Sequence, residues 1–262
     1  MYVVKRDGSH EPVSLDKVLL RIKELANGLN SSVDTVLVAT RVVQSLKNGI
    51  STSKLDGVAA EIAAVLTMEH PDYGLLAGRI ARSNKAKMNP HTFTEVMRLC
   101  SPLLSSQYLT HVENHGREMD EMVQDAIFDC NYRSFLCLER SYLLRVDGQV
   151  VETPEQLFAR VALATHAPDI ESVKRMFKHL LEGKYIHASP TLMNSGTRTP
   201  QLSSCFLISI KDDSIPAIFA TLTDCALVSK ASGGIGLDFT KVRAQGTLIK
   251  STNGICSGII PA

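Results

Sequence analysis

The sequence lacks any long apolar run and any segment that would direct it out of the cell. No stretch reaches the ~18–20 apolar residues that a membrane-spanning helix needs. The N-terminus, Met1-Tyr2-Val3-Val4-Lys5-Arg6-Asp7-Gly8, has no apolar core of a secretory signal. We therefore expect a soluble, cytoplasmic protein that does not associate with membranes.

Paired cysteines, a phosphate-binding glycine loop and excess charge are also missing. The six cysteines include no Cys-x-x-Cys pair, which argues against a zinc ribbon or a disulfide scaffold. No Gly-x-x-x-x-Gly-Lys occurs, which argues against a P-loop ATPase. With 28 basic and 27 acidic side chains, the chain has no general attraction to nucleic acid. Function must therefore be sought in local motifs.

What is present in the first 92 residues is the pattern of a hairpin followed by helices. Two short segments expected to form strands, Tyr2–Val4 and a returning one around Glu11 to Val13, flank Asp7-Gly8, a strong hairpin turn signal. Apolar residues then recur every three or four positions, which predicts four helices. These helices are expected to begin near Ser14, Asp34, Ser53 and Pro71.

The pattern stays helical to about residue 185, with turns expected at His115-Gly116 and Val146-Asp147-Gly148. Helices are predicted over 155–165 and 170–181. The residues after Pro190 instead predict a strand over 205–210, a helix over 215–229 and a strand from Gly233, which is one unit of a parallel sheet. So small a parallel sheet would have bare edges, so we expect only the beginning of a domain, and the chain to be a fragment.

Basic side chains gather around the predicted hairpin. Lys5 and Arg6 precede its turn, Lys17 lies in the first turn of the next helix, and Lys87 ends the fourth helix. Such cations, together with the N–H groups of a helix start, can converge on a triphosphate. On spacing alone, Lys5, Arg6 and Lys17 are better explained as solvated surface charges.

The order of residues in this region resembles the opening of an ATP-cone, a small regulatory domain that binds ATP or dATP. The matching runs are Val3-Val4-Lys5-Arg6-Asp7-Gly8 and Glu11-Pro12-Val13-Ser14-Leu15-Asp16-Lys17. The resemblance implies that Lys5, Arg6 and the residues from Glu11 to Lys17 line the nucleotide. It also implies that Thr52 and Asp56 contact base or ribose, and that Lys87 reaches the phosphates.

A second cluster packs hydroxyl groups and one cysteine into about twenty residues. It consists of Ala188-Ser189-Pro190-Thr191-Leu192-Met193-Asn194-Ser195-Gly196-Thr197 and Pro200-Gln201-Leu202-Ser203-Ser204-Cys205-Phe206-Leu207. Hydroxyl groups can fix a sugar beside a thiol, although an isolated Ser-Ser-Cys fits a turn and a buried thiol. The joined motifs resemble the active-site segment of ribonucleoside-diphosphate reductase large subunits. The resemblance implies that Ser189 and Ser204 bind substrate and that Cys205 is the first cysteine of a redox-active pair.

Further segments resemble the same family in the same order. The loop Ala231-Ser232-Gly233-Gly234-Ile235-Gly236 implies that backbone near Gly234 approaches the substrate. The run Lys211-Asp212-Asp213-Ser214-Ile215 resembles the specificity-effector segment, which places Asp213 at a ribose hydroxyl and Ser214 and Ile215 beside the base. Other effector positions implied by the resemblance, in a site shared across a dimer interface, are Lys230, Arg243, Lys250 and Ser251.

The resemblance implies a mainly α architecture followed by an α/β barrel, which has ten strands in the family and is incomplete here. The domains would be an ATP-cone over 1–92, a helical domain over 93–200 and the first part of the barrel over 201–262. The activity would be reduction of ribonucleoside diphosphates by thiyl-radical chemistry, in a homodimer controlled by ATP, dATP and other deoxynucleoside triphosphates, with no covalently bound cofactor. A class I enzyme also implies a small subunit that carries the metal-radical cofactor, and a thioredoxin- or glutaredoxin-type reductant.

The resemblance has gaps, and alternatives remain. The family's aromatic-glycine segment is replaced here by Cys130-Asn131-Tyr132-Arg133-Ser134-Phe135, and the chain ends before the radical-carrying cysteine, so we expect the fragment to be inactive alone. One alternative is a catalytically inert sensor of ATP and dATP, and another is a cobalamin-dependent reductase. His111 and His115 have the spacing of a metal pair but no evident third ligand, so we expect surface histidines and no metal site.

Overall fold

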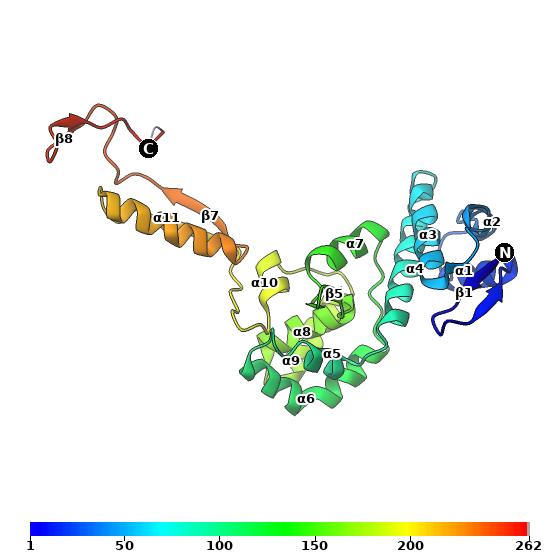
Figure 1. Cartoon of the computed structure of the whole chain (residues 1–262). Helices are drawn as coiled ribbons and strands as arrows, with labels where there is room; N and C mark the ends of the chain where they lie inside the picture. Colours follow the sequence, from blue (N-terminus) through cyan, green and yellow to red (C-terminus); the bar gives the residue numbers. More distant parts are fainter. Residues whose placement is uncertain (261–262) are drawn as a thin grey trace. The chain divides into compact units, whose positions relative to one another are not determined.

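The computed structural model describes residues 1–260, which divide into two compact units (Figure 1). The first unit comprises Met1–Ile186 and Gly196–Arg198, and the second comprises His187–Ser195 and the residues from Thr199 onward. The first unit is built mainly from helices, whereas the second combines helices α10 and α11 with short strands. Among the described residues, no helix has the length and apolar character needed to cross a membrane.

A small sheet begins the first unit. Strand β1 (Tyr2–Val4) pairs antiparallel with β2 (His10–Pro12), so the predicted hairpin is confirmed. Its turn is closed by the N–H of Lys5, which donates to the carbonyl of Ser9 at 2.8 Å. Strand β3 (Ile50–Ser51) pairs parallel with β1 on the other side and was not predicted, because two residues show no periodicity.

Four helices pack against this sheet: α1 (Leu15–Leu25), α2 (Thr35–Ser45), α3 (Thr52–Val65) and α4 (Asp72–Met88). The predicted starts of the first two are confirmed. Ser14 caps α1 by accepting from the N–H of Lys17, and Asp34 caps α2 by accepting from the N–H groups of Val36 and Leu37. The predicted cap at Ser53 is wrong. Ser51 caps α3 instead, because β3 leads directly into the helix. Aliphatic side chains of all four helices form one core.

The rest of the first unit is also helical, with elements α5 (Phe93–Leu99), α6 (Ser106–Gln124), α7 (Tyr132–Ser141), α8 (Pro154–His166) and α9 (Ile170–Leu181). The turn predicted at Asp147-Gly148 is confirmed between β4 (Arg145–Val146) and β5 (Gln149–Val150). The turn predicted at His115-Gly116 is wrong, because α6 runs through it. This glycine serves packing instead, since a Cβ there would lie 2.6 Å from the Cγ2 atom of Thr94.

A fully buried ion pair fixes helix α8 to the β4–β5 hairpin. Arg160 donates from Nε to Glu152 at 2.8 Å, and neither side chain has any exposed surface. The same carboxylate accepts the N–H of Leu144 at 2.9 Å. Removal of one partner would leave an unpaired buried charge, so the geometry of this junction is strongly specified.

The second unit contains the strand–helix–strand arrangement expected from the sequence. Strands β6 (Cys205–Ser209) and β7 (Gly234–Asp238) pair parallel across helix α11 (Ile215–Lys230), which confirms the βαβ unit. The short helix α10 (Ser189–Asn194) precedes them, and a hairpin of β8 (Leu248–Ile249) and β9 (Gly254–Ile255) follows. Large apolar side chains of this unit stay exposed, among them Leu207 at 84% and Phe219 at 59%.

Helix α4 contacts two groups of helices in the first unit, namely α1 and α3 beside the hairpin and α7 of the region that follows (Figure 1). On one side it packs on α3. On the other, Gly78 lets the backbone of Cys130 approach so closely that a Cβ would lie 1.9 Å from its carbonyl oxygen. Near the end of the helix, Lys85 and Asn89 both donate to the carbonyl of Val150, at 2.9 and 2.7 Å. The position of α4 is therefore fixed from two directions.

The close approach at Gly78 leads to a stability prediction. Substitution Gly78→Ala should lower the free energy of unfolding by about 1–3 kcal/mol, because helix or backbone must move to admit a methyl group. The matched control is Gly57→Ala in α3, where a Cβ meets nothing within 4 Å. It should raise the free energy of unfolding by about 0.5–1 kcal/mol. Urea unfolding of both variants tests this, and equal effects at the two positions would contradict it.

Candidate functional site

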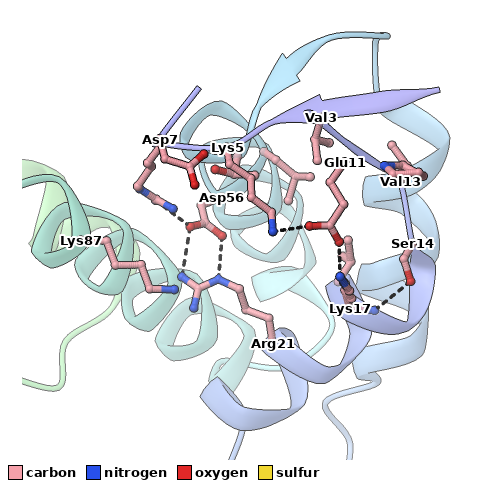
Figure 2. A pocket seen from close by; sticks show the side chains of 15 residues that line it. Val3, Lys5, Asp7, Glu11, Val13, Ser14, Lys17, Arg21, Asp56 and Lys87 are labelled. Carbon is pink, nitrogen blue, oxygen red and sulfur yellow. Dashed lines mark hydrogen bonds and ion pairs between the residues drawn. The ribbon is translucent and has the colours of Figure 1, made fainter. Parts of the chain in front are cut away.

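A cavity of about 500 Å³ opens in the first unit where the hairpin, α1, the start of α3 and the end of α4 meet (Figure 2). It is lined by Val3, Lys5, Arg6, Asp7, Glu11, Pro12, Val13, Ser14, Lys17, Val18, Arg21, Thr52, Leu55, Asp56 and Lys87. These residues come from four separate stretches of sequence. The fold therefore builds one concave site out of residues up to 84 positions apart, from Val3 to Lys87.

Most residues proposed for the nucleotide lie together in this cavity, and two do not. Leu15 and Asp16 lie in the first turn of α1 with exposed side chains and do not line it. Arg21 and Asp7 line the cavity but were not proposed. Arg21 had a usable signal, because it lies four residues after Lys17 and so on the same face of the helix.

One carboxylate of the cavity is shared by two lysines. Glu11 pairs with both Lys5 and Lys17 (Figure 2). The hydrogen bond from Lys17, followed in size by the one from Lys5, lowers the pKa of Glu11 to about 2. The carboxylate therefore stays ionised at neutral pH and keeps two cations of different segments at the mouth of the cavity.

A second carboxylate, Asp56, is shared by two arginines. Arg21 donates to it from Nε at 2.8 Å and from Nη2 at 3.1 Å, and Arg6 donates at 3.3 Å. The side chain of Asp56 is only 6% exposed, so this cluster is largely shielded from water. Arg6 is held further by Asn84 of α4, which accepts at 2.6 Å.

Lys87 differs from the other cations because no described residue forms an ion pair with it. Burial lowers the pKa of Lys87, and the positive charge of Arg21 lowers it further. The lining carries five cations (Lys5, Arg6, Lys17, Arg21, Lys87) against three carboxylates (Asp7, Glu11, Asp56). Such an excess of partly buried positive charge favours an anion in the cavity, and one with several phosphates could contact all the cations.

The second unit brings together part of the proposed substrate site. Cys205 and Gly234 are directly paired across the two parallel strands. The N–H of Gly234 donates to the carbonyl of Ser204 at 2.7 Å, and the hydroxyl of Ser204 lies 3.6 Å from the sulfur of Cys205. The thiol is exposed. A hydroxyl, a thiol and a glycine backbone therefore share the end at which β6 and β7 begin.

Asn194 holds the segments of this second site in place and was not singled out from the sequence. Its Nδ2 donates to the carbonyl of Gln201 at 2.8 Å and to that of Ala231 at 3.3 Å. Thr191 of the same short helix donates to the carbonyl of Leu202 at 3.0 Å. Helix α10, which begins at the proposed substrate residue Ser189, is thus tied to the loops that carry Ser204 and Gly234.

The proposed effector residues are only partly gathered. Arg243 donates to the carboxylate of Asp213 at 2.5 Å, and Ser214 caps α11 by accepting from the N–H of Ala217. Ile215 begins that helix, whereas Lys230 ends it, about 22 Å away at 1.5 Å per residue over 15 residue steps. Lys250 and Ser251 follow β8 in the turn of its hairpin. Among residues 1–260, the side chain of Asp213 forms its ion pair with Arg243 and not with Lys230 or Lys250.

Metal ligands are not assembled in the described part of the chain. Histidines His111 and His115 both lie on α6, one helical turn apart. Within residues 1–260, no group of three or more histidine, cysteine or carboxylate side chains is placed to hold a metal ion.

Comparison with known families gives three matches along the chain. The ATP cone domain matches residues 1–88, the all-alpha domain of ribonucleotide reductase matches 128–200, and the barrel domain of ribonucleotide reductase matches 203–262. The three ranges leave residues 89–127 between the first two. This order agrees with the resemblance seen in the sequence motifs.

Individual relatives are similar over the whole chain. The identity is 45% to the ribonucleoside-diphosphate reductase large subunit of Arabidopsis thaliana, over 100% of this chain and 34% of the plant protein. The identity to the large subunit of Caenorhabditis elegans is 44%, over 99% of this chain and 35% of the relative. The identity to the large subunit of vaccinia virus is 43%, over 100% of this chain and 36% of the viral protein. The chain thus spans about a third of the length of the curated relatives it matches.

The role of Asn194 can be tested by an isosteric change. In Asn194→Asp the donor is lost and a carboxylate faces two carbonyl oxygens, so the loops at Ser204 and Ala231 should loosen. We expect the amide hydrogen of Gly234 to exchange about tenfold faster, since each 1.4 kcal/mol of local stability is a factor of ten. Hydrogen exchange followed by NMR measures this. Asn253→Asp, in the β8–β9 turn, is the control and should leave that amide unchanged; equal rates in both variants would disprove the role.

Proposed function

Because this chain belongs to the family of ribonucleotide reductase large subunits, we propose that the whole protein reduces ribonucleoside diphosphates to deoxyribonucleoside diphosphates. The observation that carries this proposal is the exposed Cys205 thiol beside the Ser204 hydroxyl, at the start of the parallel strands. We propose the domains to be 1–92, 93–200 and 201–262, with the first as the regulatory nucleotide-binding domain.

The chemistry assigns Cys205 a reducing role. Replacement of the 2′-hydroxyl of a ribose by hydrogen consumes two electrons and two protons and releases water. Two thiols supply both electrons and both protons when they close to a disulfide, so Cys205 needs a second cysteine, which we place in the whole protein outside these residues. The thiyl radical that starts the reaction would derive from a metal-radical cofactor in a partner small subunit. A thioredoxin- or glutaredoxin-type dithiol would reduce the pair again.

The hydroxyl groups and the glycine loop would hold the substrate. Ser189 and Ser204 can hydrogen-bond to the ribose or to phosphate oxygens, and Gly234 lets backbone approach because it has no side chain. Asn194 would keep these segments at fixed distances. Reactions that depend on hydrogen transfer from carbon need reacting atoms held closely, so such positioning contributes directly to the rate.

The cationic cavity would bind the regulatory nucleotide. Lys5, Arg6, Lys17 and Lys87 would contact the triphosphate of ATP or dATP, and Thr52 and Asp56 would contact ribose or base. A second effector site would form around Asp213 and Arg243, completed across a homodimer interface by further positions such as Lys230 and Lys250. The whole protein would act in the cytoplasm.

Exposed apolar side chains of the second unit fit the same proposal. Leu207 of β6, Phe219 of α11 and Ile255 of β9 have 84%, 59% and 70% of their surface exposed. Two strands and one helix cannot bury such side chains among themselves. We propose that further elements of the barrel domain cover them in the whole protein.

A catalytically inert sensor of ATP and dATP is the second candidate. It is favoured by one observation, that every residue lining the cationic cavity belongs to the first unit, so that nucleotide binding needs no part of the second. The two candidates differ in whether Cys205 matters.

The nucleotide site predicts measurable binding by the 262-residue chain. Calorimetry should show binding of ATP and of dATP. Lys87→Gln should weaken ATP binding by about tenfold or more, because it removes a charge-assisted contact to phosphate. The control Lys54→Gln removes an exposed lysine of α3 that does not line the cavity and should change the affinity little. Absence of heat with both nucleotides would refute the nucleotide site.

The reducing role of Cys205 is tested in the whole protein, with its small subunit and a dithiol reductant. Cys205→Ser should abolish repeated turnover of ribonucleoside diphosphates to deoxyribonucleoside diphosphates, measured by chromatography of the products. Cys137→Ser replaces another exposed cysteine, in α7, and should leave turnover unchanged. Wild-type protein that binds ATP yet forms no deoxynucleotide would support the sensor instead.

A further inference from the structure

Arg21 is held in the lining of the cationic cavity by contacts to two other helices. From α1 it donates two hydrogen bonds to Asp56 of α3, at 2.8 and 3.1 Å. Its Nη2 also lies 3.3 Å from the hydroxyl of Ser83 on α4. Figure 2 shows its guanidinium pointing at Asp56, with the amine of Lys87 beside it. The side chain is 24% exposed, so it remains accessible from the cavity.

The charges around Asp56 do not balance. One carboxylate faces the guanidinium groups of Arg21 and Arg6, and the ammonium group of Lys87 lies near both. Three cations therefore surround a single, largely buried anion. Positive charge in excess around a shielded carboxylate attracts a further anion, so this corner of the cavity favours the binding of one.

We infer that Arg21 is a phosphate-binding residue of the cavity and that the Asp56 carboxylate occupies the place of a phosphate group when no nucleotide is bound. This inference rests on the proposed function, because it assigns the triphosphate of the regulatory nucleotide as the ligand. A guanidinium presents its N–H groups as a planar fork, and that fork fits two oxygens of a phosphate as well as two of a carboxylate. Phosphate can therefore replace Asp56 on Arg21 with the same geometry.

The two carboxylates that each pair with two cations, Glu11 and Asp56, suggest why Arg21 rather than Lys17 makes this exchange. Glu11, which holds Lys17, has 21% of its side chain exposed, whereas Asp56 has 6%. Water already screens the pair at Glu11, so its exchange for phosphate gains little. At Asp56 the interaction is less screened, and a phosphate bearing more negative charge than one carboxylate gains more.

The inference predicts opposite effects at the two members of the pair. In Arg21→Gln a phosphate ligand is lost, so inorganic tripolyphosphate should bind about tenfold or more weakly. In Asp56→Asn the internal competitor loses its charge, so tripolyphosphate should bind several-fold more tightly. Tripolyphosphate is the chosen probe because it has no base or ribose, which keeps any other contact of Asp56 with a nucleotide out of the measurement.

Calorimetry of the 262-residue chain with tripolyphosphate and with ATP tests this directly. Arg79→Gln is the matched control. Arg79 also binds a carboxylate through Nε and Nη2, that of Asp129 at 2.9 and 2.5 Å, but it does not line the cavity. The Arg79→Gln variant should bind tripolyphosphate and ATP with the same affinities as the wild type. If Arg21→Gln fails to fold by circular dichroism, Arg21→Lys keeps the charge without the fork and should show a smaller loss of the same sign.

The outcomes separate the inference from the proposed function. Wild-type protein that binds neither ligand would refute the nucleotide site itself. Wild-type protein that binds both, with Arg21→Gln and Arg21→Lys unchanged, would overturn the assignment of Arg21 alone. Weaker tripolyphosphate binding by Asp56→Asn would overturn the exchange, because removal of a carboxylate that competes with phosphate for Arg21 cannot weaken phosphate binding.

Discussion

Helix α4 is confined between two packed surfaces, and the arrangement of the first unit depends on this confinement. Leu76 and Ile80 belong to the core that α4 shares with the other helices around the hairpin. Gly78 admits the backbone of Cys130 at a distance that no side chain would allow. Because packed interiors have few voids, a helix held on both sides can shift only if both neighbours shift with it. The helices around the hairpin and the region around Cys130 are therefore held together through α4.

The same helix ends in the cationic cavity. Lys87 lines the cavity, and Asn84 accepts a hydrogen bond from Arg6, while Lys85 and Asn89 donate to Val150 of the neighbouring hairpin. Within six residues, one helix end thus contacts both the proposed nucleotide site and the helical region. A ligand shifts an equilibrium only by the difference in its affinity for the two states. Lys87, at this helix end, is the group through which a bound triphosphate would favour one position of α4 over another.

Local signals in the sequence were sufficient for most elements of the fold. The Asp7-Gly8 turn, the helix starts at Ser14 and Asp34, and the strands and helix predicted after Pro190 each show a local sequence pattern, and the structure confirms them. The failures have a common physical cause. Strand β3 and the role of Gly116 are set by partners distant in sequence, namely β1 and Thr94, and a glycine in a helix has the same local signature as a glycine in a turn.

The candidate sites show the same limit more sharply. The motif positions from Lys5 to Lys17 could be identified because they follow one another, but Arg21 is positioned by Asp56 and Ser83, 35 and 62 positions away. Likewise Asn194 matters because Gln201 and Ala231 fold back onto it. Residues that touch a ligand in an ordered motif can be found in a single sequence. Residues that balance charge or hold two loops together are defined by the neighbours the fold supplies, and here those neighbours decide how the site is charged and how firmly it is held.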